Sequence, residues 1–269
     1  MQDLVLLSLA MLLSGCVAGV FAGLLGVGGG IVIVPIMEVA LSFVGVDPAI
    51  RMHIAVATSL AIIIPTSISS SLAHHRRDAV DLELVKRWAV FVLVGALAGT
   101  WVAAQVHSRV LAAVFAAFAF LIGLKMSLRP DDKPMREDVP QNAAVTVLPT
   151  GIGFFSSMMG IGGGTFSVMI LTLFGKPIHR AVGTAALFGL IIALPGTIGF
   201  IIGGWGHEGL PQFSLGYVSL VGFALIAPTT VLCAPLGARI AHGLSRRQLN
   251  LVFGVFLLVA AIRMFSRAI

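Results

Sequence analysis

Long apolar runs separated by short polar ones dominate the pattern of hydrophobic and polar positions in this chain. The runs are apolar on every face, so their length and the residues that interrupt them mark the elements better than periodicity does. A single extended polar stretch, from Arg129 to Asn142, predicts a linker between two halves. Around it the pattern predicts ten helical segments, at roughly residues 4–26, 30–45, 51–73, 83–106, 109–128, 143–160, 164–175, 181–204, 214–241 and 247–268.

The composition indicates that these segments lie in a membrane. Hydrophobic residues make up 58% of the 269 residues and charged residues only 10%, whereas a soluble domain carries about 25% charged residues. The fold class predicted is therefore an all-α polytopic membrane protein, with membrane lipids as neighbours. The net charge of +6 would suit a nucleic acid partner, but the Lys and Arg residues lie in short loops and form no basic face. We therefore expect no nucleic acid partner.

A repeat relates the two halves. The stretch Gly19–Met37 recurs as Gly153–Leu171, identical at eight positions without a gap. Further along, Gly99 recurs as Gly237 at the same offset that relates Arg109 to Arg247, and AVATS (55–59) resembles AVGTA (181–185). We predict a first membrane repeat at 1–128, a linker at 129–142 and a second repeat at 143–269. Five segments in each half is an odd number, so the repeats should be inverted in the membrane.

The charged loops predict an orientation. With residues 74–87 on the cytoplasmic side, alternate loops place thirteen Lys and Arg residues there and four on the other side. This asymmetry follows the positive-inside rule. It also puts residues 129–140 in the cytoplasm, and residues 205–213 and both termini outside. The predicted location is a bacterial inner membrane, crossed many times.

Glycines mark the candidate binding site. Three consecutive glycines are unfavourable inside a lipid-facing helix, but they suit a membrane helix that breaks and leaves its N–H groups to a ligand. A helix that restarts there offers an anion site without a buried cation. The alternative is that the glycines only allow helices to pack closely. The candidate residues are Gly26, Gly28, Gly29, Gly30, Gly160, Gly162, Gly163, Gly164 and Thr165.

Hydroxyl groups are further candidates for the anion. Thr58 and Ser59 in the third segment, and Thr184 in the eighth, could donate to anion oxygens or bond back to their own helix. Glu38 is the one acidic residue well inside an apolar segment. A carboxylate there is a candidate for proton or cation coupling, and the alternative is a position near the outer interface.

Patterns of enzyme sites are missing from the sequence. It shows no Ser-His-Asp arrangement, H-E-x-x-H motif or phosphate-binding loop. The adjacent His74 and His75 should point apart and have no partner at metal-ligand spacing. We therefore expect no catalysis, no cofactor and no metal, and a homodimer stays open.

Several of these motifs together resemble the TauE/SafE sulfite exporter family. They are GLLGVGGGIVIVPIM (23–37), AVATSLAIIIPTSISSSLAH (55–74), GIGFFSSMMGIGGGTFSVMIL (151–171), HRAVGTAALFGLIIALPG (179–196) and LGARIAHGLSRRQL (236–249). The resemblance spans nearly the whole chain apart from the linker, and implies a carrier of sulfite and small organosulfonates such as sulfoacetate. Ala185 stands where the family pattern leads us to expect Ser, which narrows the second-half hydroxyl to Thr184.

Membrane energetics predict the direction of transport. An inside-negative potential drives an anion outward by ~2.3 kcal/mol per charge per 100 mV. Export of the anion therefore needs no coupling ion. The alternatives are a proton-coupled carrier, with Glu38 as the titrating group, an importer of a related anion, an anion channel, and an accessory protein that binds no anion.

Overall fold

The protein is described here from a computed structural model, whose described residues are 11–13, 15–22, 29–128, 144–243 and 246–268. They are nearly all helical, which confirms the all-α class. Residues 11–13 and 15–22 are helical. The helices that follow are α2 (Gly30–Phe43), α3 (Pro48–His75), α4 (Leu82–Gln105), α5 (Ser108–Leu128), α6 (Ala144–Met159), α7 (Gly164–Leu173), α8 (Ile178–Gly203), α9 (Leu220–Gly243) and α10 (Arg246–Ala268).

Four of these helices are long and apolar enough to cross a membrane. They are α3, α4, α5 and α8, and each exceeds the ~20 residues that a bilayer requires. By contrast α2 and α7, the helices that follow the two glycine breaks, have 14 and 10 residues. They are half-length elements, as broken membrane helices should be. The chain is thus a multi-pass membrane protein with short helices at its glycine-rich segments.

Helix starts follow local sequence. Asp47 caps α3, where its Oδ1 accepts the N–H of Ala49 at 2.8 Å and Pro48 occupies the first helical position; Pro is favoured there because that N–H has no intrahelical acceptor. Asp81 caps α4 by accepting the N–H of Leu84 at 3.1 Å. These starts confirm the expected segments within a few residues.

One predicted boundary is wrong. The segment expected at 214–241 begins as a two-stranded antiparallel hairpin, β1 (Ser214–Leu215) and β2 (Val218–Ser219), and α9 starts only at Leu220. Gly216 in the turn has φ 54°, a conformation that glycine adopts without steric cost. The mostly apolar sequence of this hairpin resembles the start of a helix, although the chain turns here.

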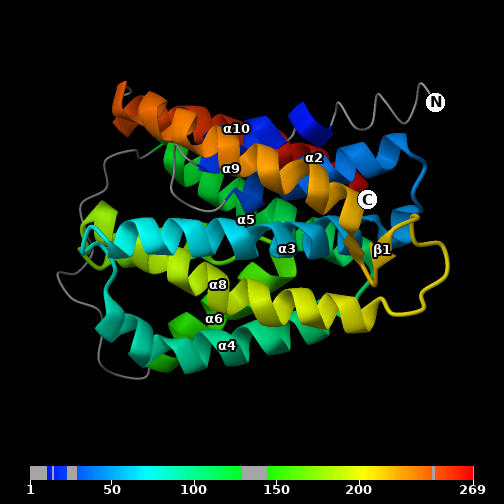
Figure 1. Cartoon of the computed structure of the whole chain (residues 1–269), viewed down its shortest axis with the longest axis horizontal. Helices are drawn as coiled ribbons and strands as arrows, with labels where there is room; N and C mark the ends of the chain where they lie inside the picture. The colour runs from blue at the N-terminus through cyan, green and yellow to red at the C-terminus, as the bar shows by residue number, and fades with distance from the viewer. Residues whose placement is uncertain (1–10, 14, 23–28, 129–143, 244–245, 269) are drawn as a thin grey trace.

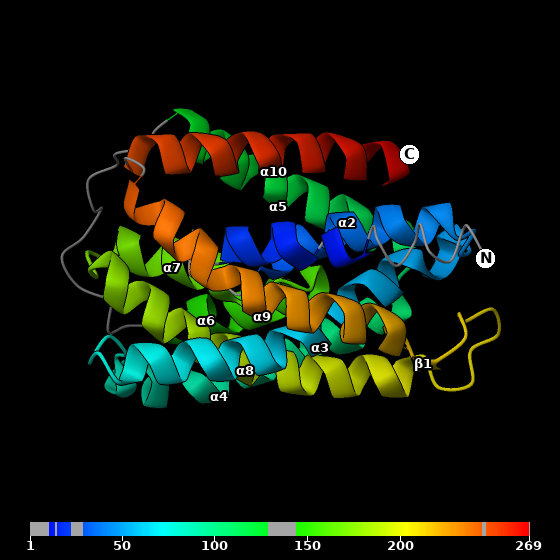
Figure 2. The same cartoon turned by 45° about the horizontal axis from the view of Figure 1, so that its top comes forward.

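The helices form layers. In Figure 1, α3 and α8 run side by side through the middle, with α4 and α6 on one side and α5 and α10 on the other. Figure 2 shows α10 packed along α5. The α3–α4 loop lies at one end of the bundle, and the hairpin and the C-terminus lie at the other (Figure 1). The buried core includes Trp88, Phe115, Phe188 and Phe200, all without exposed surface.

Matched glycine contacts join helices in the two halves. A Cβ added at Gly153 in α6 would collide with the carbonyl oxygen of Val92 in α4. A Cβ added at Gly19 would stand 2.5 Å from the carbonyl oxygen of Thr230 in α9. Gly19 aligns with Gly153, and Thr230 occupies the second-half position of Val92, so both halves use glycine for the same close approach. These glycines are packing positions; the domain boundaries at 128 and 143 stay predictions.

Candidate functional site

Both glycine breaks start a helix from a left-handed residue. Gly29 precedes α2 and Gly163 precedes α7, each with φ 74°, and neither helix has a side-chain cap. Residues with a Cβ rarely adopt this conformation. The first intrahelical bond of α7 runs from Ser167 N–H to Gly163 O at 2.8 Å. The N–H groups of the preceding turn therefore point outward, at the positive end of the helix dipole.

The two breaks touch each other. A Cβ at Gly30 would stand 2.6 Å from the carbonyl oxygen of Gly160 and equally close to the Cδ1 atom of Ile63. Ile63 also packs against Gly162, where an added Cβ would be 2.7 Å from its Cγ2. Ser59 donates from Oγ to Gly160 O at 2.7 Å. The structure therefore brings Gly30, Ser59 and Gly160 together, with Ile63 between the breaks.

The second break carries buried hydroxyls without partners. Ser156, Thr165 and Ser167 are 0%, 6% and 0% exposed, and their hydroxyl oxygens have no hydrogen-bond partner among the residues that the structure describes. Ser156 Oγ lies 3.7 Å from the Cβ position of Gly163, beside the start of α7. Buried polar groups are normally hydrogen-bonded, because leaving them unpaired costs free energy. These buried hydroxyls flank a positive helix end, with Thr165 and Ser167 on different sides of α7 because they are two residues apart. The start of α7 is therefore equipped for an anionic ligand.

The first break is chemically different. Under the repeat alignment Ser156 corresponds to Ala22, and Thr165 and Ser167 correspond to Ile31 and Ile33. The methyl group of Ala22 lies 3.2 Å from the Cβ position of Gly29, in the role that Ser156 plays at Gly163. Of these aligned positions in the two breaks, only those of the second break carry hydroxyl groups. Our sequence reasoning named Thr165 but missed Ser156 and Ser167, although the alignment already showed hydroxyls opposite apolar residues.

Thr58 and Thr184 each accept a backbone N–H near an end of the bundle, and they do not meet at the breaks. Thr58 Oγ1 accepts the N–H of Ser219, and Thr184 Oγ1 accepts the N–H of Asp81, both at 3.0 Å. Asp81 and Ser219 occupy corresponding positions, each accepting a backbone N–H in the first turn of the next helix. Each threonine thus reaches into the opposite half. A ligand role for their own protons stays a prediction.

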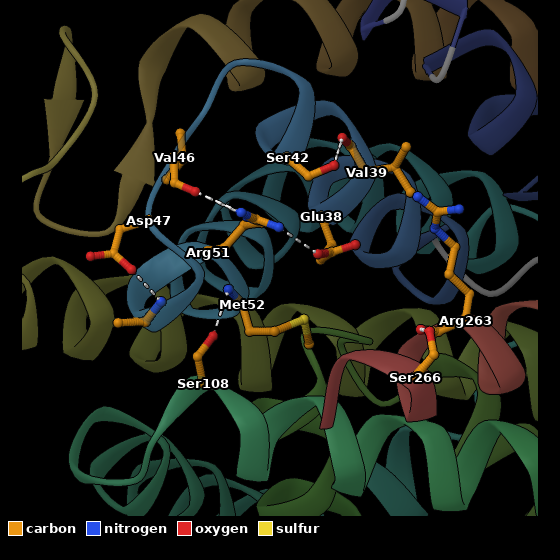
Figure 3. Close-up of polar contacts among 11 residues, drawn as sticks. Glu38, Val39, Ser42, Val46, Asp47, Arg51, Met52, Ser108, Arg263 and Ser266 are labelled. Carbon is orange, nitrogen blue, oxygen red and sulfur yellow. Dashed lines mark hydrogen bonds and ion pairs between the residues drawn. The ribbon is translucent and has the colours of Figure 1, made fainter. Parts of the chain in front are cut away.

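Glu38 is buried and paired. It is 2% exposed, and its Oε1 lies 3.3 Å from Nη1 of Arg51, which is 7% exposed. Val46 O accepts two further N–H groups of the same guanidinium (Figure 3). The sequence did not suggest this pairing, and a coupling role for Glu38 stays a prediction.

Two of the candidate glycines, Gly26 and Gly28, lie outside the residues that the structure describes. Within the described ranges, no group of three or more His, Cys, Asp or Glu residues could hold a metal ion.

Comparison with known proteins identifies the family. The family model described as sulfite exporter TauE/SafE matches residues 11–264. A probable membrane transporter protein of Haemophilus influenzae is 34% identical over 261 residues, covering 96% of this chain and 98% of that protein. A probable membrane transporter protein of Methanocaldococcus jannaschii is 25% identical over 273 residues, with 96% and 97% covered. The probable membrane transporter protein YunE of Bacillus subtilis is 27% identical over 209 residues, with 71% and 77% covered.

No solved structure matches the chain. The family match nevertheless spans both glycine breaks, the paired threonines and the four long apolar helices. The chain therefore belongs to the TauE/SafE family and is a multi-pass membrane transporter of that family.

Proposed function

We propose that this protein exports small sulfur oxyanions, sulfite or short organosulfonates such as sulfoacetate, across a bacterial inner membrane. The family description names a sulfite exporter. The observation that carries the proposal is the set of three buried hydroxyls around the start of α7 that have no partner among the described residues. Ser156, Thr165 and Ser167 supply O–H donors where the helix supplies N–H donors.

The chemistry of this cluster suits a compact anion with several oxygens. A sulfonate or sulfite group presents three oxygens, each able to accept more than one hydrogen bond. The N–H groups of Gly164, Thr165 and Phe166 precede the first intrahelical bond of α7 and are available as donors. Hydrogen bonds to charged groups contribute about 1.5–3 kcal/mol each. A site of neutral donors can hold an anion and still release it, as transport requires.

Glycines let the chain pack closely around the start of α7. At Gly163 an added Cβ would collide with Ile192 and stand 3.7 Å from Ser156 Oγ, so only glycine allows this close packing at the α7 start. Gly30 and Gly160 bring the first break against the second. We assign the anion to the α7 side of this contact, because the first break offers Ala22, Ile31 and Ile33 in place of hydroxyls.

The negative charge of the substrate suggests the direction of transport. Export of the anion down an inside-negative potential gains ~2.3 kcal/mol per charge per 100 mV, so we propose uniport. A proton-coupled carrier or an importer of a related anion is the alternative. Glu38 is its candidate coupling group, since this carboxylate is buried in an apolar helix.

A ligand panel tests the substrate class. The purified protein is heated with sulfite, sulfoacetate, isethionate, sulfate and taurine, each against chloride at equal ionic strength. A ligand at one hundred times its Kd stabilises by ~2.7 kcal/mol. We expect sulfite or a sulfonate anion to raise the unfolding temperature more than chloride or zwitterionic taurine does. Equal responses to all of these solutes would contradict the proposed substrate class.

A further inference from the structure

A polar cavity lies away from the glycine breaks. It has a volume of about 710 Å³ and is lined by Glu38 of α2, by the first turns of α3 and α5, and by Ser266 of α10. Its charged lining side chains include Arg51, Arg109, Glu38 and Asp47. The α3 start lies at the end of the bundle opposite the α3–α4 loop (Figure 1). Under the predicted orientation this cavity faces the outside.

The guanidinium of Arg51 is held by the backbone more tightly than by its acidic partner. Its Nη2–H donates to Val46 O at 2.8 Å and its Nε–H to the same oxygen at 3.2 Å. Its Nη1 is 3.3 Å from Glu38 Oε1, longer than the ~2.7–2.9 Å of a strong charge-assisted bond. These bonds use three of the five N–H donors of an arginine. Arg51 is therefore fixed in place with a loosely held charge facing Glu38 (Figure 3).

Helix geometry connects this cavity to the glycine breaks. Met52 of the cavity lining and Ser59 of the break contact are seven residues apart on α3, and Glu38 and Gly30 are eight apart on α2. Both separations are about two helical turns, ~10–12 Å. They place each pair on one face of its helix. The cavity and the breaks therefore lie along the same α2–α3 seam.

We propose that this cavity is an outward-facing oxyanion site, in which the anion replaces the Glu38 carboxylate on Arg51. Ser108 lines the cavity and its Oγ already accepts the N–H of Met52 at 3.0 Å, so it meets an anion as a donor. The N–H groups of Ser108 and Arg109 precede the first bonded N–H of α5, that of Val110, and lie at the positive end of its dipole; in the first turn of α3 Asp47 already accepts the N–H groups of Ala49, Ile50 and Arg51. The inference rests on the proposed function, since it assigns the same class of anion a release site.

Thiol labelling tests occupancy of the cavity. Ala49 is exposed on its lining, and Cys16 and Cys233 are free thiols, so the probe is A49C in a C16S/C233S background. The purified protein reacts with a maleimide in the presence of isethionate, sulfate or choline at equal ionic strength. We expect isethionate and sulfate, but not choline, to slow the labelling. Equal rates in all three solutions would overturn the proposal, and E208C in the α8–β1 loop controls for reagent effects.

Three variants distinguish an anion site from a structural ion pair. Glu38→Gln removes the competing carboxylate, so the half-protecting isethionate concentration should fall about tenfold, a ~1.4 kcal/mol gain in binding free energy. The matched Glu38→Gln/Arg51→Gln double variant should lose protection. If Glu38→Gln instead weakens protection or leaves it unchanged, the carboxylate does not compete and the assignment fails. Arg109→Gln, at an exposed cavity position, should weaken protection without touching the buried pair.

The outcome separates this inference from the proposed function. Protection of A49C without any transport of sulfur oxyanions would support the outer site and refute export. Transport without protection of A49C would support export and refute the outer site.

Discussion

Ser156 and Ser157 are neighbours in α6 whose hydroxyls have different surroundings. Ser157 Oγ donates to Phe154 O at 3.0 Å within its own helix, whereas Ser156 Oγ is buried beside the α7 start without a partner among the described residues. Only Ser156 is therefore available to a ligand. This contrast provides an internal control for the anion site.

Ser156→Ala should weaken binding of the sulfur oxyanion by about 1–3 kcal/mol, the cost of losing a hydrogen bond to a charged group. Binding is measured by titration calorimetry on the purified protein. Ser157→Ala is the control and should bind as the wild type does. If the two variants lose affinity equally, or neither does, the hydroxyl cluster at α7 does not hold the anion.

At the scale of single residues, the sequence predicted the backbone of the site better than its side chains. Repetition of G-x-G-G-G was enough to predict two broken helices, because few other structures use three glycines in an apolar segment. Ser156 and Ser167 were not predicted as site residues, because an apolar segment does not show which face of its helix is buried against which neighbour. The pairing of Glu38 with Arg51 escaped for the same reason, since it depends on how α2 and α3 pack.

At the scale of elements, two threonine bonds tie each half to the residue that directly precedes a helix of the other half. Thr184→Val should destabilise the protein by about 1–3 kcal/mol, because the N–H of Asp81 loses its acceptor. Thr58→Val should have a similar effect through the N–H of Ser219. Thermal unfolding in the absence of any anion measures both.

Thr66→Val is the matched control for these variants. Thr66 Oγ1 bonds only to carbonyl oxygens of its own helix α3, at 3.1 Å, and those carbonyls keep their helical partners. Its loss should change the unfolding temperature little. A control variant as unstable as Thr184→Val would show that the effect reflects loss of any helical threonine hydroxyl and not of the bond between the halves.

The ion pair between Asp81 and Lys176 makes this end of the bundle sensitive to acid. Burial by itself raises the pKa of Asp81, but the hydrogen bond from Lys176 Nζ at 2.8 Å, the N–H of Leu84 and the charges of Lys176 and Arg180 give a pKa below the usual value. Stability from this carboxylate is thus present above the unfolded-state pKa of ~3.9 and is lost as pH falls through the folded-state pKa.

Asp81→Asn should therefore lower the unfolding temperature at neutral pH, by an amount that shrinks as the pH falls below about 4. Unfolding of wild type and variant across an acid pH series is the measurement. Asp78→Asn, in the exposed part of the same loop, should follow the wild-type profile. A difference between Asp81→Asn and wild type that grows on acidification would contradict the assignment.

Element boundaries were predictable from sequence where polar residues and prolines interrupt the apolar runs. Asp47-Pro48 and Asp81 mark the starts of α3 and α4 because their side chains and geometry favour the first turn. The β1–β2 hairpin was missed because a single Gly216 among Leu215, Tyr217 and Val218 looks like part of the apolar run that continues into α9, and tertiary contacts fix the conformation. Tyr217, for example, is buried and stacks against His53 at a centroid distance of 5.0 Å.

At the scale of the whole molecule, the ends of the bundle should face opposite sides of the membrane. The α3–α4 loop carries Arg76 and Arg77, while the α8–β1 loop lies at the other end with the hairpin (Figure 1). By the positive-inside rule we expect the first loop to be cytoplasmic. A cysteine at Gly206 should then react with an impermeant thiol reagent on intact cells, and a cysteine at Arg77 only after permeabilisation. The reverse pattern would refute the orientation.

Flux through reconstituted vesicles tests the central claim most directly. Proteoliposomes loaded with ³⁵S-labelled sulfite are diluted, and efflux is followed with and without an imposed inside-negative potential. Export through the α7 site predicts saturable efflux that the potential accelerates and that Ser156→Ala slows, while Ser157→Ala matches the wild type. Efflux no faster than from protein-free vesicles, or equal in the wild type and Ser156→Ala, would contradict the account.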